Sequence, residues 1–256
     1  MFNNKMMSKL IFIIVGPIFL FGFSVPKFIP IIEPVDKVIG GAANLIGNFD
    51  IEDSPYYKKI DIYKSNPTTT LIKLSNFKTY QQTSEYSCGA SCVIMVLDYF
   101  GIHNVSENQL VKEMDVRSYE NKRDDGSFGA TTESIVKALE SRGLKVDSSA
   151  DGYSFNSPEQ FREFVKESLN NDQIIISENV EWGGHWMVIV GYDDMATESL
   201  MDDVLIFADP SDTTNHNQNG YICKSFLRYF YEWFDARVLP KEQSIQQFVR
   251  VFKVNK

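Results

Sequence analysis

Cysteine is scarce in this chain: three cysteines occur in 256 residues, and their number is odd. Three thiols are too few for a disulfide-stabilised scaffold, and at least one stays free unless it pairs with another chain. No C-x-x-C pair is present, so the usual cysteine pattern of a zinc module or a dithiol redox site is missing. These absences leave room for a cysteine that acts alone.

Basic charge is also in short supply. The chain has 25 lysines and arginines against 34 aspartates and glutamates, a formal net charge of −9. Because no basic patch stands out, nucleic acid is not expected as a main partner. The composition is 43% hydrophobic, with 19 Phe and 12 Tyr, which suffices for the core of one large domain or two small ones.

The first 25 residues have the pattern of an export signal. Lys5 and Lys9 precede an apolar run from Leu10 to Val25, and no acidic residue occurs before Glu33. The run is shorter than the roughly 20 residues of a membrane-spanning helix, and no A-x-A cleavage site follows it. A cleaved signal peptide and an uncleaved membrane anchor both stay open, and a buried core helix is the third alternative. Residues 1–25 are therefore expected to contact the membrane or the export machinery, with the rest of the chain outside the cytoplasm, secreted or membrane-anchored.

Residues 26–70 are predicted to be a spacer or a wrap-around arm. They contain five prolines, at positions 26, 30, 34, 55 and 67, and the pair Gly40-Gly41. Proline at this density favours extended chain over regular structure. The globular domain is then expected over residues 71–256.

The most informative stretch runs from Gln82 to Gly101, QTSEYSCGASCVIMVLDYFG. The segment from Cys88 to Phe100 has almost no polar face, which predicts a helix buried on most sides and ended by Gly101. Cys88 would begin that helix, where backbone N–H groups and the helix dipole favour a thiolate. Cys88 is thus the candidate nucleophile. Cys92, one turn further on, is predicted to be a buried core thiol.

Helical patterns dominate the first half of the remaining chain and strand patterns the second half. This order predicts an α+β fold with two halves and a cleft between them. A short strand is expected within 71–80. Further helices are expected after Ser106, after Thr131 or Thr132, after Ser157 and over 226–234, with strands at 173–177, 185–192, 204–208 and 248–254.

A nucleophilic cysteine needs a base, and histidine suits this role because its pKa lies near neutrality. The chain has three histidines. His103 follows Gly101 on a surface-like turn, and His216 lies in a polar loop. His185 opens the apolar run HWMVIVGY directly after two glycines, and it is the candidate base. The alternative is a histidine that merely begins a strand.

An acidic residue should orient the histidine. Asp209 ends the run VLIFA and lies beside His185 if the two strands pair. Asp193 and Asp194 belong to the same strand as His185 and would be some 25 Å away at about 3.3 Å per residue. Asp212 is a second candidate.

Acyl transfer also requires hydrogen-bond donors for the oxyanion. The backbone N–H of Cys88 can supply one. The side-chain amide of Gln82, six residues upstream, can supply another. Its neighbour Gln81 is not excluded by spacing.

Three motifs of the chain resemble those of a known family. Gln82 followed by CGASC and VIMVLDYFG resembles the opening motif of the bacteriocin-processing, double-glycine cysteine peptidases. GGHWMVIVGYDD resembles their histidine strand, and FADPSD resembles their Asp-Pro segment. The resemblance spans roughly residues 77–252. It implies a papain-like fold with an antiparallel sheet, catalytic Cys88, His185 and Asp209, oxyanion donor Gln82, and no metal or cofactor.

The chain also departs from that family's transporters. These carry transmembrane spans and an ATPase after the peptidase, and the phosphate-binding motif G-x-x-x-x-G-K-[ST] is missing here. The chain is more similar to the single-domain exported relatives. Cleavage after a Gly-Gly leader is therefore not carried over, and the expected partner is a peptide or protein substrate of unspecified sequence.

Four functions compete at this stage. The favoured one is a cysteine peptidase, a thiol-dependent amide hydrolase. An acyl or peptidyl transferase would use the same triad with a different acceptor. A catalytically silent peptidase-like domain would bind peptides only. A metal or redox site built from Cys88, Cys92, Cys223 and His185 is disfavoured, because no close second pair completes a tetrahedron.

Overall fold

The computed structural model describes residues 66–213, 219–234 and 246–253. The predictions for residues 1–25, for most of 26–70 and for His216 lie outside the described residues. In chain order the elements are β1 (Leu71–Lys73), α1 (Cys88–Tyr99), α2 (Glu107–Glu113), α3 (Thr132–Glu140), β2 (Lys145–Ser148), η3 (Ser149–Asp151), α4 (Pro158–Asn170), β3 (Ile174–Asn179), η4 (Glu181–Gly183), β4 (His185–Asp193), β5 (Val204–Ala208), β6 (Tyr221–Ser225), α5 (Phe226–Tyr231) and β7 (Phe248–Phe252).

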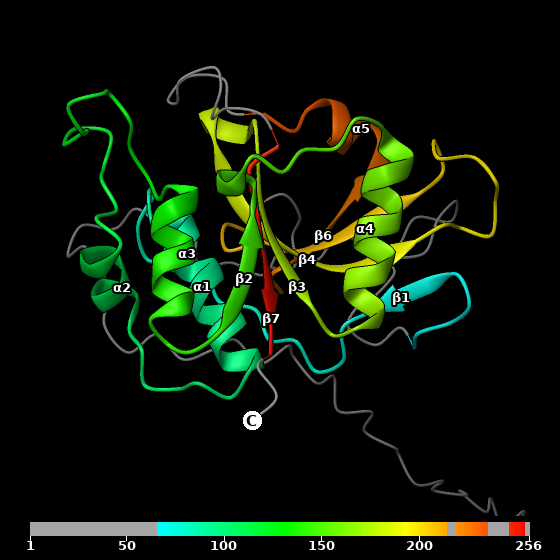
Figure 1. Ribbon diagram of the computed structural model, residues 1–256, viewed down its shortest axis with the longest axis horizontal. Helices are drawn as coiled ribbons and strands as arrows, with labels where there is room; N and C mark the ends of the chain where they lie inside the picture. The colour runs from blue at the N-terminus through cyan, green and yellow to red at the C-terminus, as the bar shows by residue number, and fades with distance from the viewer. Residues whose placement is uncertain (1–65, 214–218, 235–245, 254–256) are drawn as a thin grey trace, which may run out of the picture.

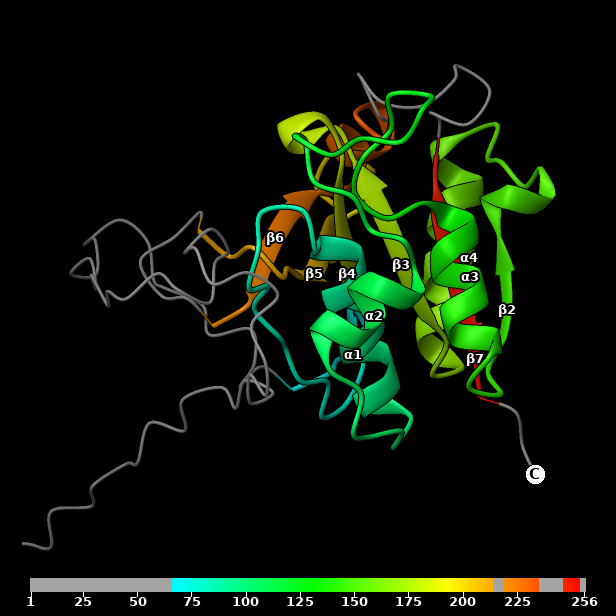
Figure 2. The same ribbon diagram turned by 90° about the vertical axis from the view of Figure 1, so that its left-hand side faces the viewer.

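One antiparallel sheet organises the fold. Its order is β2-β7-β3-β4-β5-β6, and β1 pairs with the far end of β4. The central strand β4 is buried along His185–Tyr192, as its unbroken apolar run predicts. The helices cover both faces of the sheet. Figure 1 shows α1 and α3 on the left of the sheet and α4 on its right, and Figure 2 shows α1, α2 and α3 in front of it.

The predicted helix starts are found where the sequence places hydroxyl side chains. The hydroxyl of Ser106 caps α2 by accepting the backbone N–H of Gln109. The hydroxyl of Ser157 caps α4 in the same way, by accepting the backbone N–H of Gln160. Thr131 and Ser134 form a reciprocal capping box at α3. The box predicted at α2 is only half formed, because the Gln109 side chain donates to Glu113 instead.

The α+β class and the helix-on-sheet arrangement are confirmed, with differences in detail. The strand expected within 71–80 ends at Lys73, and α5 ends at Tyr231 rather than at 234. The strands β2 and β6 were not predicted. The sheet also mixes both parts of the chain, because β1 and β2 precede α4 and the last strand, β7, lies between β2 and β3.

The cysteine helix α1 packs against the central strand. Its residues from Cys88 to Leu97 are all buried. Gly101 follows the helix with a φ of 77°, the left-handed conformation expected of a glycine stop. Because β4 begins with His185, this packing brings the first residue of α1 to the same end of the sheet as the candidate base.

Candidate active site

Cys88 is the first residue of α1, and it is 6% exposed. The residue before it, Ser87, does not cap the helix with its side chain; its hydroxyl donates to the carbonyl of Ser84 at 3.2 Å. The first turn also contains no acidic residue. The positive end of the helix dipole is therefore left to act on the cysteine sulfur or on a bound oxyanion.

Gly89 allows another segment to lie close to the cysteine. A Cβ atom at this position would lie 2.5 Å from the Cβ of Ala130 and 3.4 Å from the Cδ1 of Trp186. Only glycine fits without a shift of the backbone that carries Ala130. The indole N–H of Trp186 in turn donates to the carbonyl of Ala130 at 3.1 Å. The segment before α3 is thus held against the start of α1.

His185 and Asp209 are joined directly. The Nε2 atom of His185 lies 2.7 Å from Oδ1 of Asp209, and both side chains are almost fully buried. The antiparallel pairing of β4 with β5, in which Val188 lies opposite Ala208, places the two residues at the same end of the sheet. Oδ1 of Asp209 also accepts the backbone N–H of Ser211 at 2.7 Å. The strand pairing expected from the sequence is therefore present.

Electrostatics favour a charged pair at this position. Burial lowers the pKa of His185, but the Asp209 carboxylate outweighs it and, with a contribution from the Cys88 sulfur, raises the pKa to about 10. Burial alone would raise the pKa of Asp209, yet the His185 ring holds it below its usual value. Since Nε2 of His185 faces Asp209, the other ring nitrogen, Nδ1, is left for the Cys88 sulfur, which contributes to the raised pKa of the ring.

The two adjacent glutamines have different environments. Gln81 donates from Nε2 to the carbonyl of Asp209 at 2.7 Å, and its Oε1 accepts the N–H of Asp212 at 3.1 Å. Both ends of the Gln81 amide thus hold the segment that carries Asp209. Gln82 donates from Nε2 to the carbonyl of Ser84 at 2.7 Å. Because an amide NH₂ has two hydrogens, one donor of Gln82 is left over.

Asp212, the second-line acid, lies near the pair without replacing Asp209. Its Oδ2 accepts the backbone N–H of Gly220 at 2.8 Å. Burial and the neighbouring Asp209 carboxylate raise the pKa of Asp212 to about 7. Asp193 is at the opposite end of β4, where it pairs with Leu71 in β1, so it does not contact His185.

A buried carboxylate that the sequence did not reveal supports the segment before Cys88. Glu107 in α2 is 1% exposed. It accepts the hydroxyl of Tyr80 at 2.8 Å and the backbone N–H of Thr83 at 3.0 Å. Burial raises the pKa of Glu107, and the hydrogen bonds from Thr83 and Tyr80 oppose this rise. In the sequence it resembles an ordinary acidic residue of a helix first turn.

The other cysteines and histidines differ from Cys88 and His185. The Cys92 thiol is fully buried and donates to the carbonyl of Trp186 at 3.3 Å, and burial raises its pKa well above the usual value. The prediction that Cys92 is a core thiol is confirmed. His103 is exposed and pairs with Asp98. Among the described residues, no group of three or more His, Cys, Asp or Glu side chains is arranged to hold a metal ion.

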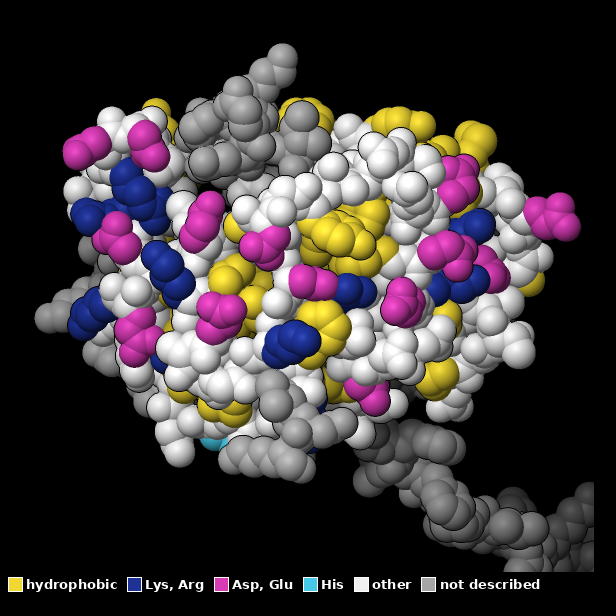
Figure 3. Space-filling view, in the orientation of Figure 1, with side chains coloured by type: hydrophobic (Ala, Val, Ile, Leu, Met, Phe, Trp, Pro, Cys, Tyr) yellow, Lys and Arg dark blue, Asp and Glu magenta, His cyan; other side chains and the backbone are white. Residues whose placement is uncertain are grey.

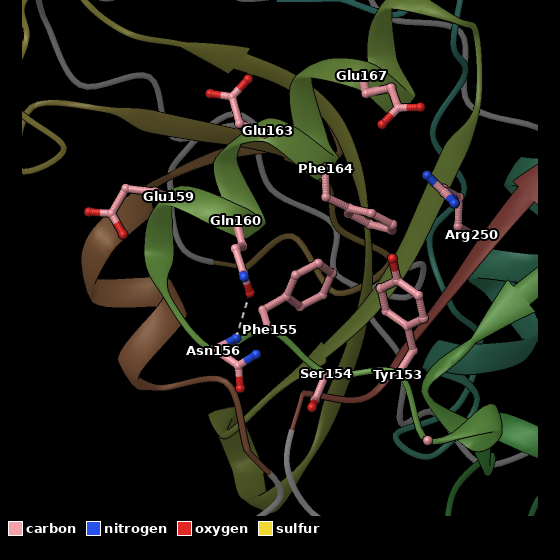
Figure 4. Close-up of a pocket in the computed structure, with 11 residues that line it drawn as sticks. Tyr153, Ser154, Phe155, Asn156, Glu159, Gln160, Glu163, Phe164, Glu167 and Arg250 are labelled. Carbon is pink, nitrogen blue, oxygen red and sulfur yellow. Dashed lines mark hydrogen bonds between the residues drawn. The ribbon is translucent and has the colours of Figure 1, made fainter.

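A hollow of about 900 Å³ lies on the α4 face of the molecule, away from α1. Figure 4 shows the aromatic rings of Tyr153, Phe155 and Phe164 close to one another, with the carboxylates of Glu159 and Glu163 of α4 pointing away from them. Figure 3 shows hydrophobic side chains in the middle of this face with both acidic and basic ones around them. The hollow contains none of the candidate site residues.

The described helices give no sign of a transmembrane element: none in that part of the chain is both long enough and apolar enough to cross a bilayer.

A helix that starts with a cysteine packs on an antiparallel sheet that supplies a histidine and an aspartate, and this arrangement belongs to the α+β class. The family model described as "Peptidase_C39 like family" matches residues 74–236, so the chain belongs to this family. The family resemblance noted in the sequence is confirmed. No curated protein matches the chain.

Solved structures of the same family are similar to the chain at low identity. A C39-like peptidase from Bacillus anthracis is 16% identical over 73% of this chain and 99% of its own, with a TM-score of 0.47. The peptidase domain of Streptococcus ComA, a bifunctional ABC transporter of a quorum-sensing pathway, is 16% identical over 69% and 97%, with a TM-score of 0.41. A double-glycine-motif protease from an AMS/PCAT transporter, solved with a leader peptide, is 17% identical over 72% and 94%, with a TM-score of 0.41.

Proposed function

We propose that this protein is a cysteine peptidase that cleaves peptide or protein substrates with Cys88, His185 and Asp209. The observation that carries the proposal is the buried hydrogen bond between His185 and Asp209, with the Cys88 sulfur on the same imidazole ring. Membership of a peptidase family supports the assignment of this chemistry to the site.

In the first half of the reaction, the Cys88 sulfur attacks the carbonyl carbon of the scissile amide. The carbonyl oxygen gains negative charge, which the backbone N–H of Cys88 and the free Nε2 hydrogen of Gln82 stabilise. His185 then donates its proton to the leaving nitrogen, the C–N bond breaks, and the amine departs. A thioester between substrate and Cys88 remains.

In the second half, a water molecule attacks the thioester carbon while His185 accepts one of its protons. The C–S bond breaks, the carboxylic acid leaves, and the thiolate–imidazolium pair is restored. Asp209 keeps the imidazole oriented and stabilises its positive charge in both halves. The raised pKa of His185 keeps the ring protonated in the resting site, as the first proton transfer requires.

Activity-based labelling of the full-length protein tests this function. A peptide library with thiol-reactive electrophilic groups is incubated with the native protein, and the modified residue is located by mass spectrometry. We expect an adduct on Cys88 that is lost after Cys88→Ala, and the mass spectra distinguish it from any adduct on Cys223, the exposed free thiol. Cys92→Ala should leave labelling intact, because the Cys92 thiol is buried and occupied by Trp186. Equal labelling of both cysteines in native protein would overturn the assignment.

Product analysis separates hydrolysis from the two alternatives. A cleaved peptide that carries a free carboxylate indicates a peptidase. A peptide joined to an added amine indicates transfer. A native protein that binds library peptides without forming an adduct on Cys88 indicates a silent binding domain.

We also propose that the domain acts outside the cytoplasm, since residues 1–25 have the charge and hydropathy of an export signal. Cell fractionation with N-terminal sequencing of the recovered protein tests this. Recovery of the intact chain in the cytoplasmic fraction would contradict it.

A further inference from the structure

Trp182 is a large apolar side chain left in solvent beside the candidate base. It lies in η4, the short turn between β3 and β4, and it is 60% exposed. Its ring is 4.8 Å from the His185 ring, measured between centroids, with the planes at 70°. The other two tryptophans, Trp186 and Trp233, are each only 2% exposed. An exposed indole against a buried histidine calls for an explanation of its own.

The backbone holds Trp182 in a costly conformation. Its φ is 54° and its ψ is 16°, the left-handed region that residues with a side chain rarely adopt. A residue in this region persists only where its surroundings impose the conformation. The turn is closed by hydrogen bonds from Gly183 to Val180 and from Gly184 to Glu181, both at 3.0 Å.

Two further contacts fix the turn to the strands of the site. The side chain of Asn179, the residue that pairs with His185 across β3 and β4, accepts the backbone N–H of Glu181 at 3.2 Å. The carboxylate of Glu181 forms an ion pair with Lys224 of β6. The turn is therefore anchored on both sides of the histidine, and the position of Trp182 follows from the same strands that position His185.

We propose that Trp182 is the wall of the subsite that receives the substrate residue directly after the scissile bond. The inference rests on the peptidase function proposed above. His185 must deliver its proton to the nitrogen of the leaving amine, so the leaving part of the substrate lies against the His185 ring. Trp182 is the exposed side chain in contact with that ring. The side chain attached next to the leaving nitrogen therefore meets the indole.

The chemistry of the indole defines the preferred substrate residue. A flat apolar surface that is already ordered gains most from burial under an aliphatic or aromatic side chain. Glycine leaves it exposed, and an aspartate must give up water without receiving a partner from the indole carbons. Leucine or phenylalanine at this substrate position is thus favoured over glycine or aspartate by about ten-fold.

Kinetics on matched peptides test the subsite. Internally quenched peptides that differ only in the residue after the cleaved bond (Leu, Phe, Gly or Asp) are given to the full-length protein and to Trp182→Ala and Trp182→Phe. We expect Trp182→Ala to lower kcat/KM about ten-fold for the Leu and Phe peptides, mostly through KM, and little for the Gly peptide. Trp182→Phe should keep most of the preference.

The control is Met201→Ala. Met201 is 75% exposed and lies in the connection that joins the far end of β4 to β5. Met201→Ala should therefore leave kcat/KM unchanged for all four peptides. An equal fall for all four peptides with Trp182→Ala would overturn the subsite, because Trp182 would then act only on His185. Equal cleavage of the four peptides by the unaltered protein would overturn it as well.

A binding measurement separates this inference from the peptidase function. In the Cys88→Ala protein, acrylamide should quench mainly Trp182, because Trp186 and Trp233 are buried. Peptides with Leu or Phe at the tested position should protect the fluorescence, and those with Asp should not. Protection without turnover by the unaltered protein retains the subsite and rejects the peptidase. Turnover without a preference among the peptides and without protection of the fluorescence retains the peptidase and rejects the subsite. If neither turnover nor protection is seen, the peptidase and the subsite are both rejected.

Discussion

The Nε2 atom of His185 and the Oδ1 atom of Asp209 lie 2.7 Å apart, although the residues are separated by 24 positions in the chain. The antiparallel pairing of β4 with β5 produces this contact, and β5 has to end at Ala208 for Asp209 to turn toward the histidine. Cys88 reaches the same imidazole from the helix that packs on β4. The central strand β4 thus brings the three residues of the site together. The role of each residue can be tested separately.

Asp209→Asn is expected to lower turnover by about two orders of magnitude or more. An amide has nearly the shape of the carboxylate but carries no charge to stabilise the imidazolium ring. Peptide turnover, with thermal unfolding measured in parallel, checks the prediction. Asp193→Asn is the control, since Asp193 lies at the far end of β4. Full turnover by the Asp209→Asn protein would remove the carboxylate from the mechanism.

The stability of the protein should fall as the pH rises from about 6.5 toward 10, in part because of His185. The folded pKa of His185 is about 10, above the usual 6.5, so the folded state holds a proton that the unfolded state has lost. The contribution of His185 to the free energy of unfolding is complete below the pKa that the residue has in the unfolded state. This contribution is lost as the pH rises through the pKa that His185 has in the folded state. Urea unfolding of the native protein and of His185→Gln across this range isolates the effect.

The informative quantity is the difference between those two unfolding curves, because tyrosines and the buried Cys92 also titrate at high pH. We expect the difference in unfolding free energy to shrink as the pH rises. A difference that is constant or grows with pH contradicts the assigned charge of His185.

Gly89→Ala should destabilise the protein by about 1–3 kcal/mol, because its new methyl group would lie 2.5 Å from the Cβ of Ala130. The other neighbours lie at ordinary contact distance, with Trp186 Cδ1 at 3.4 Å and Ile135 Cδ1 at 3.5 Å. Removing the obstacle with Ala130→Gly in the same chain should therefore restore much of the loss. Urea unfolding of both single variants and the double variant completes the cycle. Additive losses would place the cause elsewhere than in this contact.

Glu107→Ala is expected to cost about 1–3 kcal/mol of stability, because the hydroxyl of Tyr80 and the N–H of Thr83 lose a buried acceptor. Glu107→Gln keeps one acceptor oxygen and should lose less. Since the folded pKa of Glu107 is raised, the wild-type protein should lose more stability than the Glu107→Ala variant as the pH rises through that pKa. Glu113→Ala, an exposed position of the same helix, is the matched control. Equal unfolding curves for the two alanine variants would contradict the role of Glu107.

The sequence predicts the parts of the site that depend on local pattern. The strands of His185 and Asp209 are marked by continuous apolar runs, and the cysteine helix by a segment without a polar face. The strands β2 and β6 are not marked in this way, because KVDS and YICKS mix polar and apolar residues and become strands by pairing with β7 and β5.

Other features depend on tertiary contacts that a local pattern does not contain. Glu107 matches a surface acid of a helix first turn, yet the segment that precedes Cys88 folds over it and buries it. The exposed position of Trp182 beside His185 depends on a positive φ at a residue that is not glycine. The two glutamines are adjacent and chemically identical, and only the approach of the Asp209 segment gives Gln81 its hydrogen bonds.

Gln81 and Gln82 can be distinguished by mutation, because removal of the Gln81 amide should mainly lower stability and removal of the Gln82 amide should mainly lower kcat. Gln81→Ala removes both contacts with the Asp209 segment, so it should lower stability by about 1–3 kcal/mol and reduce turnover through misplacement of Asp209. Gln82→Ala removes the proposed oxyanion donor and should lower kcat by about 10²–10³ with a smaller loss of stability. Both variants are measured by urea unfolding and by peptide turnover, with alkylation of Cys88 as a check that the thiol is unaffected. An unchanged kcat in the Gln82→Ala protein would remove Gln82 from the oxyanion role, whatever Gln81→Ala does, because Gln81 also positions Asp209.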